Sequence, residues 1–243
     1  MSPRYPSTEE PISAAAPVTA ALVSPLPVPT HGAGGTFTVL AHTRTSASPL
    51  TVLNLIRDTN SWSKWNTFCP AGVITSKSKG KGTQGERKES FGGGEESEGW
   101  LEQGTEAVID VFMSGDGLVQ GRKRSRTQAI VVTHLGRIED EKDGVKRSGY
   151  RVAWKAIGWA HWQLHSERVM EFVQREEGGT EYACWETFGG VLGPVVKRMV
   201  GGTLVDRFGD YARDVKGFLE GVERVDADED GGAGEDNLRR RST

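Results

Sequence analysis

GPVVKRMVGGTLVDRFGDYARDVKGFLEGVE, residues 193 to 223, is the stretch that decides the fold. Its apolar residues recur in steps of three and four, which predicts one apolar stripe along a helix. They are Val196, Met199, Val200, Leu204, Phe208, Tyr211, Ala212, Val215, Phe218 and Leu219. Pro194 suits the first helical turn, because the amide that it lacks has no partner there. At about 1.5 Å per residue the helix is roughly 45 Å long, so it has to lie across something broad.

Upstream of this helix the chain reads as a series of strands. Strand-like segments occur at residues 36–45, 72–76, 105–114, 128–138, 150–159, 162–174 and 180–188. The last three follow one another through short connections, which is typical of an antiparallel meander with one face on the core. We therefore predict an α+β fold in which a curved antiparallel sheet of about six to seven strands grips the long C-terminal helix. Two short helices are expected after the first strand.

Composition divides the chain into one domain and two tails. Residues 1–34 are rich in Ser, Pro and Ala, and residues 224–243 are charged, so both are predicted to be disordered. The domain is expected over residues 35–223, with a flexible insertion at about 77–99 where Lys, Gly, Glu and Ser dominate. The apolar part of the N-terminal tail is interrupted by prolines and is shorter than the roughly 18 residues of a membrane helix. We predict no signal peptide and no integral membrane segment.

Net charge and cysteine content limit the classes of binding partner and the cellular compartment that we expect. A net charge of -3 and a pI near 6.0 create no broad positive field, so nucleic acid is not an expected partner. Cys69 and Cys184 lie far apart without a CxxC motif, which indicates a reducing compartment, and we expect a cytoplasmic monomer without a cofactor. The GxGxxG match at residues 80–85 neither follows a strand nor opens a helix, so it predicts no dinucleotide site. The basic run at residues 122–126 is interpreted as a solvated loop or an edge strand.

Three motifs together resemble the helix-grip superfamily, which includes START domains, the birch pollen allergen, coenzyme-Q-binding proteins and bacterial polyketide cyclases. The first is WSKWNTFCP at residues 62–70, after the first predicted helix. The second is the turn at residues 178–180 leading to ETFG at residues 186–189, and the third is the long closing helix. The resemblance covers about residues 36–222, and the long insertion departs from the usual pattern. It implies an apolar cavity between sheet and helix that holds a lipid, sterol, quinone or polyketide.

Strand parity selects the side chains that are expected to face this interior. If Trp154 points inward, Val152 on the same strand does too, and on the next strand the more apolar alternate set contains Arg168. A buried arginine needs a partner, and Glu186 on the following strand is the candidate. An exposed cross-strand ion pair is the open alternative. The predicted ligand-binding residues are Trp62, Trp65, Phe68, Val152, Trp154, Arg168, Met170, Phe172, Glu186, Met199, Leu204 and Phe208.

Other chemistry has weaker support in the sequence. His161 and His165 have the spacing of metal ligands on a helix, but they fall in a strand context without clustered cysteine or histidine, so no metal site is predicted. An acid/base role for one histidine in a cyclase-like reaction stays open, because imidazole titrates near neutral pH. Cys184 has no assignable histidine partner, so nucleophilic catalysis is not expected. No catalytic residue is assigned.

The leading prediction is a protein that binds, and transports or sequesters, a hydrophobic small molecule. The first alternative is an enzyme of the polyketide cyclase or aromatase type, in which Glu186, Arg168 or a histidine moves a proton. The second is a protein-interaction module of the chaperone co-factor type. Transient contact with a membrane is a further open alternative. The Gly201-Gly202 pair lowers helix propensity, so a weak or bent first section of the closing helix and a hinge for ligand exchange are also predicted.

Overall fold

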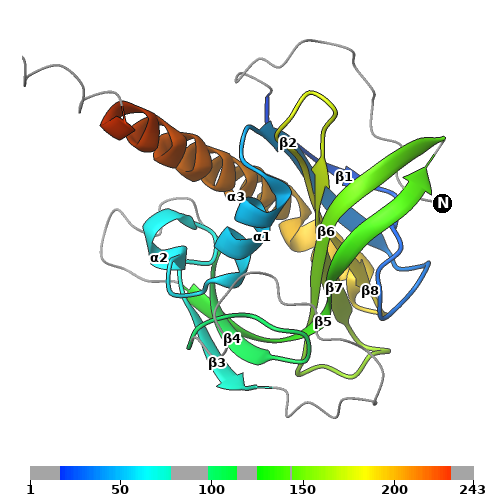
Figure 1. The fold of residues 1–243 in the computed structure, drawn as a ribbon. Coiled ribbons are helices and arrows are strands. Elements are labelled where there is room, and N and C mark those ends of the chain that lie inside the picture. Colours follow the sequence, from blue (N-terminus) through cyan, green and yellow to red (C-terminus); the bar gives the residue numbers. More distant parts are fainter. Residues whose placement is uncertain (1–16, 78–97, 114–124, 143, 231–243) are drawn as a thin grey trace, which may run out of the picture.

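A computed structural model describes residues 17–77, 98–113, 125–142 and 144–230. In this part of the chain the strands form one antiparallel sheet in the order β1-β2-β8-β7-β6-β5-β4-β3 (Figure 1). The strands are β1 (Thr19–Val23), β2 (Phe37–Thr45), β3 (Gly72–Ser76), β4 (Glu106–Phe112), β5 (Ser125–Lys142), β6 (Val145–Ala156), β7 (His165–Gln174) and β8 (Thr180–Gly189). The helices are α1 (Pro49–Arg57), α2 (Trp62–Trp65) and α3 (Gly193–Asp230). The eight strands exceed the six to seven predicted, and the α+β class is confirmed.

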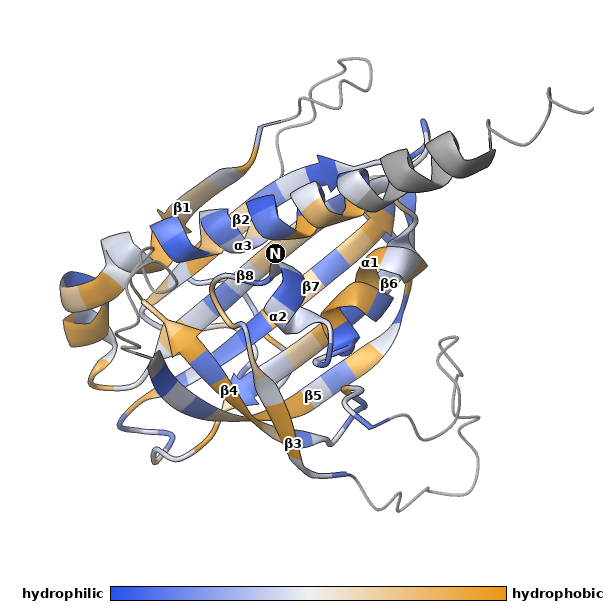
Figure 2. Cartoon of the chain, turned by 90° about the vertical axis from the view of Figure 1, so that its left-hand side faces the viewer, coloured by the Kyte–Doolittle hydropathy of each residue, from blue (hydrophilic) through white to orange (hydrophobic). Residues whose placement is uncertain are grey.

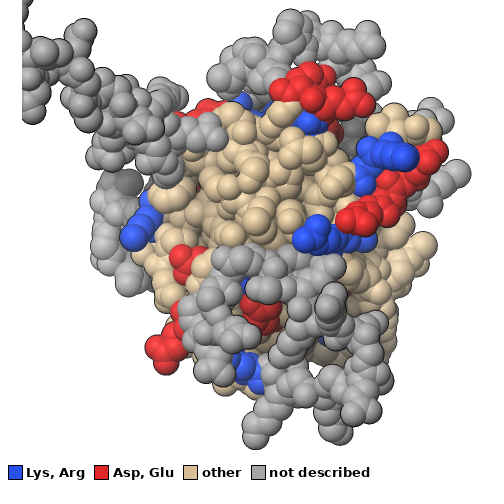
Figure 3. Space-filling view, in the orientation of Figure 1, with Lys and Arg blue, Asp and Glu red and all other residues tan. Residues whose placement is uncertain are grey.

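The sheet curves around α3, which crosses one of its faces (Figure 2). This concave face is the inner face: α3 contacts β1, β2 and β8, while α1 covers β6 and β7. Helix α1 starts where Ser48 accepts a hydrogen bond from the Thr51 amide at 3.2 Å, followed by Pro49 in the first turn. Over α1 the molecular face is uncharged at its centre, with charged side chains around the margin (Figure 3). The arrangement is the predicted helix-grip fold.

The main core lies between the inner face and the helices. Alternate residues of β6 and β7 point to it, which confirms the predicted parity for Val152 and Trp154. From α3 the core receives a stripe at intervals of three and four residues, namely Leu204, Phe208, Tyr211, Ala212, Val215 and Leu219. No described helix has both the length and the apolar composition that crossing a bilayer requires.

The N-terminal segment differs from the prediction of disorder over residues 1–34. Residues 19–23 form β1, which pairs with β2 in the register Ala21 opposite Leu40. Beyond β1 the chain crosses the outer face of the sheet, and we call residues 24–32 the strap. Leu26 and Val28 of the strap pack on Trp185 and its neighbours in a second apolar cluster. The composition of this segment alone favours disorder. The segment is ordered because it packs on an apolar surface that distant strands form.

Several element boundaries also differ from the expectation. Strands β6 and β7 end and begin inside the predicted segments, so Trp159 and Trp162 lie in the connection between them. Helix α3 continues to Asp230, beyond the predicted end of the domain at residue 223. It is helical through Gly201 and Gly202. Most of the insertion at 77–99, the GxGxxG match, most of the basic run at 122–126 and the outer parts of both tails lie outside the described residues.

Candidate functional site

A buried ion pair lies at the centre of the inner face. Arg168 of β7 stands directly opposite Glu186 of β8 in the antiparallel register. The Nε and Nη2 atoms of Arg168 donate to Oε2 of Glu186 at 3.0 and 2.9 Å. The two side chains are only 7% and 13% exposed, so the pair that strand parity predicts is present and is shielded from water.

Aromatic rings surround the guanidinium of this pair. Its central carbon lies 4.5 Å from the ring centre of Phe208, 5.1 Å from Phe68, 5.9 Å from Tyr211 and 6.0 Å from Trp154. These rings come from α3, from the loop after α2 and from β6, so three separate parts of the chain enclose one cation. Arginine is attracted to ring faces at such distances, and the attraction is strongest where water is excluded. The result is a charged group held in an otherwise apolar interior.

The electrostatics of this interior keep Arg168 charged and the neighbouring thiols neutral. Burial, the largest single effect, lowers the pKa of Arg168, but Glu186 together with Cys69, Cys184 and Tyr211 outweighs burial, and the net pKa is raised. Burial raises the pKa of Cys69 to about 11 and that of Cys184 to about 12. Both thiols are therefore protonated at neutral pH, and a protonated thiol is a poor nucleophile.

The WSKWN segment positions one wall of the site. The indole N–H of Trp62 donates to the carbonyl oxygen of Ile56 at 3.0 Å, which fixes α2 against α1. The ring of Trp65 packs on Tyr211 of α3, with ring centres 5.5 Å apart. The side-chain oxygen of Asn66 accepts a hydrogen bond from the Cys69 amide at 2.7 Å. This bond closes the turn that contains Phe68, whose ring is buried in the core. The motif thus connects the short helices to α3.

Polar contacts clamp the same loop onto α3. The Thr67 amide and hydroxyl donate to Oδ2 of Asp214 at 2.8 and 2.7 Å. Arg207 is buried, pairs with Asp210 at 2.8 Å and donates to the Thr67 hydroxyl at 3.1 Å. The helical periodicity places Arg207, Asp210 and Asp214 on the polar face of α3, and no sequence signal shows that this loop covers part of that face.

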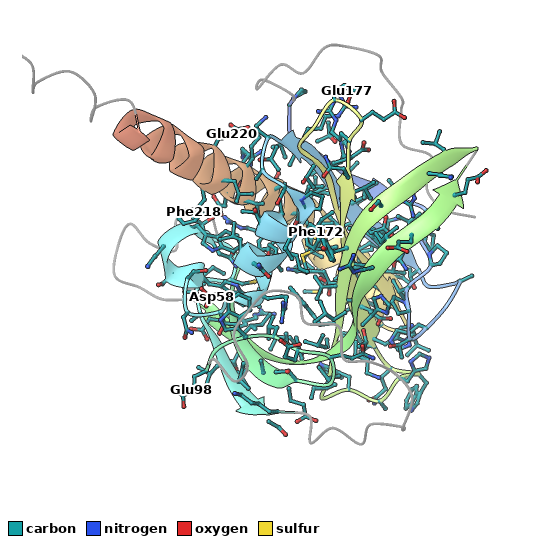
Figure 4. All side chains as sticks on the ribbon, viewed as in Figure 1. Asp58, Glu98, Phe172, Glu177, Phe218 and Glu220 are labelled. Carbon is teal, nitrogen blue, oxygen red and sulfur yellow. The ribbon has the colours of Figure 1, made fainter. Side chains whose placement is uncertain are left out.

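Most predicted site residues meet in this interior. Phe172 lies among the buried side chains between α1 and the sheet (Figure 4), and its ring stacks on Tyr182 at 5.7 Å. The other predicted residues buried in the same core are Trp62, Trp65, Phe68, Val152, Trp154, Met170, Leu204 and Phe208. Their contact with a ligand stays a prediction. Sequence reasoning omitted Tyr211 from the site, although its position on the apolar stripe of α3 was a usable signal.

Met199 is the predicted site residue that the structure places elsewhere. Its side chain is 75% exposed, so the assignment to the ligand-facing set is wrong. Val200, the next residue, packs against the core instead. Neighbouring helical positions differ by about 100° in direction, and the sheet covers only a narrow stripe at the start of α3. The periodic pattern is compatible with either Met199 or Val200 facing the core.

Three further tryptophans do not line the interior. Trp185 is buried on the outer face, where its indole N–H donates to the carbonyl oxygen of Pro27 at 3.3 Å. Trp159 and Trp162 are 59% and 65% exposed. The Val191 amide donates to the Trp162 carbonyl oxygen at 3.0 Å, so the β6–β7 and β8–α3 connections lie together. The exposed apolar residues of this region, which we call the apolar end, are Trp159, Trp162, Val191, Leu192, Val195 and Met199.

The chain is similar to one curated protein and to several solved structures. No protein-family model matches the chain. It is 27% identical over 210 residues to the Oxopyrrolidines biosynthesis cluster protein O of Penicillium oxalicum, covering 80% of this chain and 91% of the relative. Among solved structures it is similar to a hypothetical protein from Helicobacter pylori, with a TM-score of 0.48 and 10% identity over 88% of this chain and 99% of the other. It is also similar to a START superfamily protein from Mycobacterium smegmatis, with a TM-score of 0.47 and 14% identity over 78% and 99% of the two chains. The helix-grip assignment itself rests on the strand order and on the position of α3.

Proposed function

We propose that the protein binds a hydrophobic small molecule between the sheet and α3, with Arg168 as its polar anchor. The observation that carries this proposal is the Arg168–Glu186 pair enclosed by four aromatic rings. A buried ion pair adds little stability compared with well-packed apolar side chains, so stability alone does not account for it. Apolar interiors with a few placed polar groups are typical of small-molecule sites.

The chemistry of the pair indicates the class of ligand. An apolar body would pack on the rings of Phe68, Trp154 and Phe208, which lie within about 6 Å of the guanidinium. A guanidinium carries five N–H groups, and Glu186 accepts two hydrogen bonds from Arg168. A carbonyl, hydroxyl or carboxylate oxygen on the ligand would accept from the same group. Oxygenated lipids, sterols, quinones and polyketides have this combination.

Ligand binding is tested with protein from its own host and with a probe. Native mass spectrometry of the purified protein is expected to show a co-purifying apolar molecule. 1-Anilinonaphthalene-8-sulfonate, an aromatic anion, is expected to bind the emptied protein saturably at one site. The double variant Arg168→Met/Glu186→Met removes both charges together and should weaken the probe at least about tenfold, since an anion loses its charged partner.

Two controls accompany this measurement. Glu181→Gln alters a carboxylate on the same strand that pairs with His42, and it should leave probe affinity unchanged. Near-UV circular dichroism of each variant verifies native packing, because the probe also binds partly unfolded proteins. Equal affinity in the double variant, or the absence of both co-purifying ligand and saturable binding, contradicts the proposal.

The second candidate function is an enzyme of the cyclase type that uses the same interior. Two observations favour it: the similar Penicillium oxalicum protein is named for a biosynthesis cluster, and Glu186 places a carboxylate beside a cation in a shielded interior. Holding a reactive chain in one conformation accelerates its ring closure, and a carboxylate can take up the proton released. Incubation with a poly-ketone thioester should give a cyclised product with wild-type protein and none with Glu186→Gln. An unchanged substrate in the wild-type reaction excludes this function.

We also infer transient contact with an anionic membrane through the apolar end. Lys197 and Arg198 are exposed beside Met199, and residues 157–164 and 189–205 contain no acidic residue. Exposed tryptophans with flanking cations are the combination that binds a lipid interface. Phosphatidylcholine vesicles containing phosphatidylserine should therefore sediment the protein, and Trp159→Ser/Trp162→Ser should abolish sedimentation. Lys197→Glu/Arg198→Glu should remove only the dependence on phosphatidylserine. Sedimentation that survives the tryptophan changes contradicts this inference.

A further inference from the structure

Three histidines from distant parts of the chain meet at one end of the outer face. His31 belongs to the strap, His161 to the β6–β7 connection and His165 to the first position of β7. The ring centre of His31 lies 4.7 Å from that of His161 and 4.5 Å from that of His165, while the latter two rings are 3.9 Å apart. One nitrogen from each ring lies within 4.8 Å of the other two. We propose that this cluster, the three-histidine site, binds a divalent transition-metal ion such as Zn²⁺.

The fold holds His31 over the other two rings by contacts outside the cluster. The amide and the hydroxyl of Thr30 donate to the two carboxylate oxygens of Glu167, at 2.7 and 2.9 Å. Val28 and Gly32 close the turn between them with two backbone hydrogen bonds of 3.0 and 2.8 Å. Residues 30 and 167 are 137 positions apart, so the juxtaposition exists only in the folded chain. The ligand atoms are thus brought together by structural contacts that need no metal.

The hydrogen bonding of the rings leaves nitrogen lone pairs for an ion. Nδ1 of His165 lies 2.7 Å from the carbonyl oxygen of His161. A carbonyl only accepts, so Nδ1 carries the proton and Nε2 carries the lone pair. Metal-binding histidines are oriented in this way, by a hydrogen bond from the nitrogen that does not bind. Gly189 lets this ring lie close to the sheet, because a Cβ there would approach Nε2 to 2.2 Å.

His31 supplies the second independent indication of a ligand. Its Nε2 atom is buried and has no hydrogen-bond partner among the described residues. A buried polar atom without a partner destabilises the folded state, and an ion at this position would relieve that cost.

The geometry requires a modest rearrangement of one ring. In a tetrahedral zinc site with Zn–N bonds of about 2.0 to 2.1 Å, ligand nitrogens are roughly 3.3 Å apart. The ring of His161 stacks on that of His165 at an interplanar angle of 15°, and it has to turn out of this stack. The His161 side chain is exposed, so its ring can rotate without displacing a packed side chain of the described residues. Three imidazole ligands leave a fourth position for water or another donor.

The site is independent of the proposed ligand interior, because it lies on the other face of the sheet. An ion here would tie the strap and the β6–β7 connection to β7. That connection also carries Trp159 and Trp162, so its order affects the apolar end. The sequence alone does not predict this site, since His161 and His165 lack a third ligand until the strap is placed.

Metal binding is tested on the full chain without a histidine tag. Zn²⁺ competed against a chromophoric chelator should bind with one equivalent, and Co²⁺ at the same site should give the visible absorption of a tetrahedral ion. His161→Gln and His165→Gln should each weaken Zn²⁺ at least about tenfold. His42→Gln and His134→Gln change the other two histidines of the chain and are matched controls that should keep wild-type affinity.

Thermal unfolding separates this site from adventitious binding to the unfolded chain. Zn²⁺ should raise the Tm of the wild type and of His42→Gln, because the ion binds the folded state, and should leave the Tm of His161→Gln unchanged. Hydrogen exchange of the strap amides should slow with Zn²⁺ in the wild type and in His42→Gln, and should not change in His161→Gln. Equal Zn²⁺ affinity in His161→Gln and wild type, or no binding by the folded wild type, overturns the proposal.

Discussion

The two faces of the sheet bury charge in different ways, and neighbouring residues of β7 show the contrast. Arg168 points to the inner face and pairs with Glu186 on the next strand. Glu167 points to the outer face, is fully buried, and accepts hydrogen bonds from the amide and hydroxyl of Thr30 and from the hydroxyl of Thr133. Arg168 pairs with an opposite charge on the neighbouring strand, whereas Glu167 is satisfied by neutral hydrogen-bond donors from the strap and from β5.

This difference separates a structural charge from a candidate recognition charge. Glu167 joins segments that share no strand ladder, so its hydrogen bonds determine where the strap lies. Arg168 and Glu186 join strands that are already paired along their whole length, so the hydrogen bonds of the inner pair connect no further strand. The inner pair is therefore the candidate for the ligand recognition proposed above.

Breaking the inner pair on one side should have the largest effect. Glu186→Gln leaves the Arg168 charge buried without a counter-ion and should lower the free energy of unfolding by about 3 kcal/mol. Arg168→Met/Glu186→Met removes both charges and should recover most of this loss. Urea unfolding measures both, with Glu181→Gln as the control. If the double variant is as unstable as the single one, the pair is structural and the contrast between the faces fails.

Glu167→Gln tests the outer face and should cost about 2 kcal/mol, since charge-assisted hydrogen bonds to Thr30 and Thr133 are weakened. Hydrogen exchange should accelerate selectively at the amides of Val28, Thr30 and Gly32. Glu171→Gln is the matched control, because Glu171 lies on the same strand and pairs with Arg147 and Arg151 instead of the strap. Equal exchange of the strap in both variants would contradict the role assigned to Glu167.

A change in α3 sharpens the comparison by tightening the cover of the inner face. A Cβ at Gly202 would meet nothing within 4 Å, so Gly202→Ala should raise the free energy of unfolding by about 0.5 to 1 kcal/mol. At Gly201 the added Cβ would lie 3.4 Å from Leu22 of β1, which is an ordinary contact, and a similar gain is expected. If Gly201 and Gly202 act as a hinge, replacing both by alanine should also slow release of the anilinonaphthalene probe in stopped-flow measurements. Unchanged release assigns the glycines to packing.

The smallest expected effect is a pH dependence on the outer face. Burial, and after it the charge of Arg151, lower the pKa of His134. A folded-state pKa below the unfolded value of about 6.5 means that the unfolded chain binds more protons below that pH. The stability contribution is therefore present above pH 6.5 and is lost as the pH falls toward the folded-state pKa. His134→Gln should flatten the fall in Tm below pH 6.5, and an identical slope in wild type and variant excludes this source.

Local patterns predicted the inner face well. The period of two in the strands placed Val152, Trp154 and Arg168 on one side, and the structure confirms all three. The helical period predicted the stripe of α3 but left Met199 and Val200 undecided, because the width of the stripe depends on how the sheet meets the helix. Buried Arg207 shows the same limit, since the loop that covers it comes from residues near Thr67.

The outer face could not be predicted in this way. Leu26, Val28 and His31 follow no period, and their partners Trp185 and His165 lie far along the chain. Composition therefore favoured a disordered tail where the structure has a strand and a strap.

By itself the sequence determined most of the elements from β2 to α3, the direction of the side chains of the central strands and Arg168 and Glu186 as candidate partners, because backbone geometry repeats every 2 or 3.6 residues and imprints that period on the apolar pattern. Only the tertiary structure decided what covers the outer face and which histidines meet there. Those contacts depend on the surface that the assembled sheet leaves open, and no local repeat encodes a surface made by distant strands.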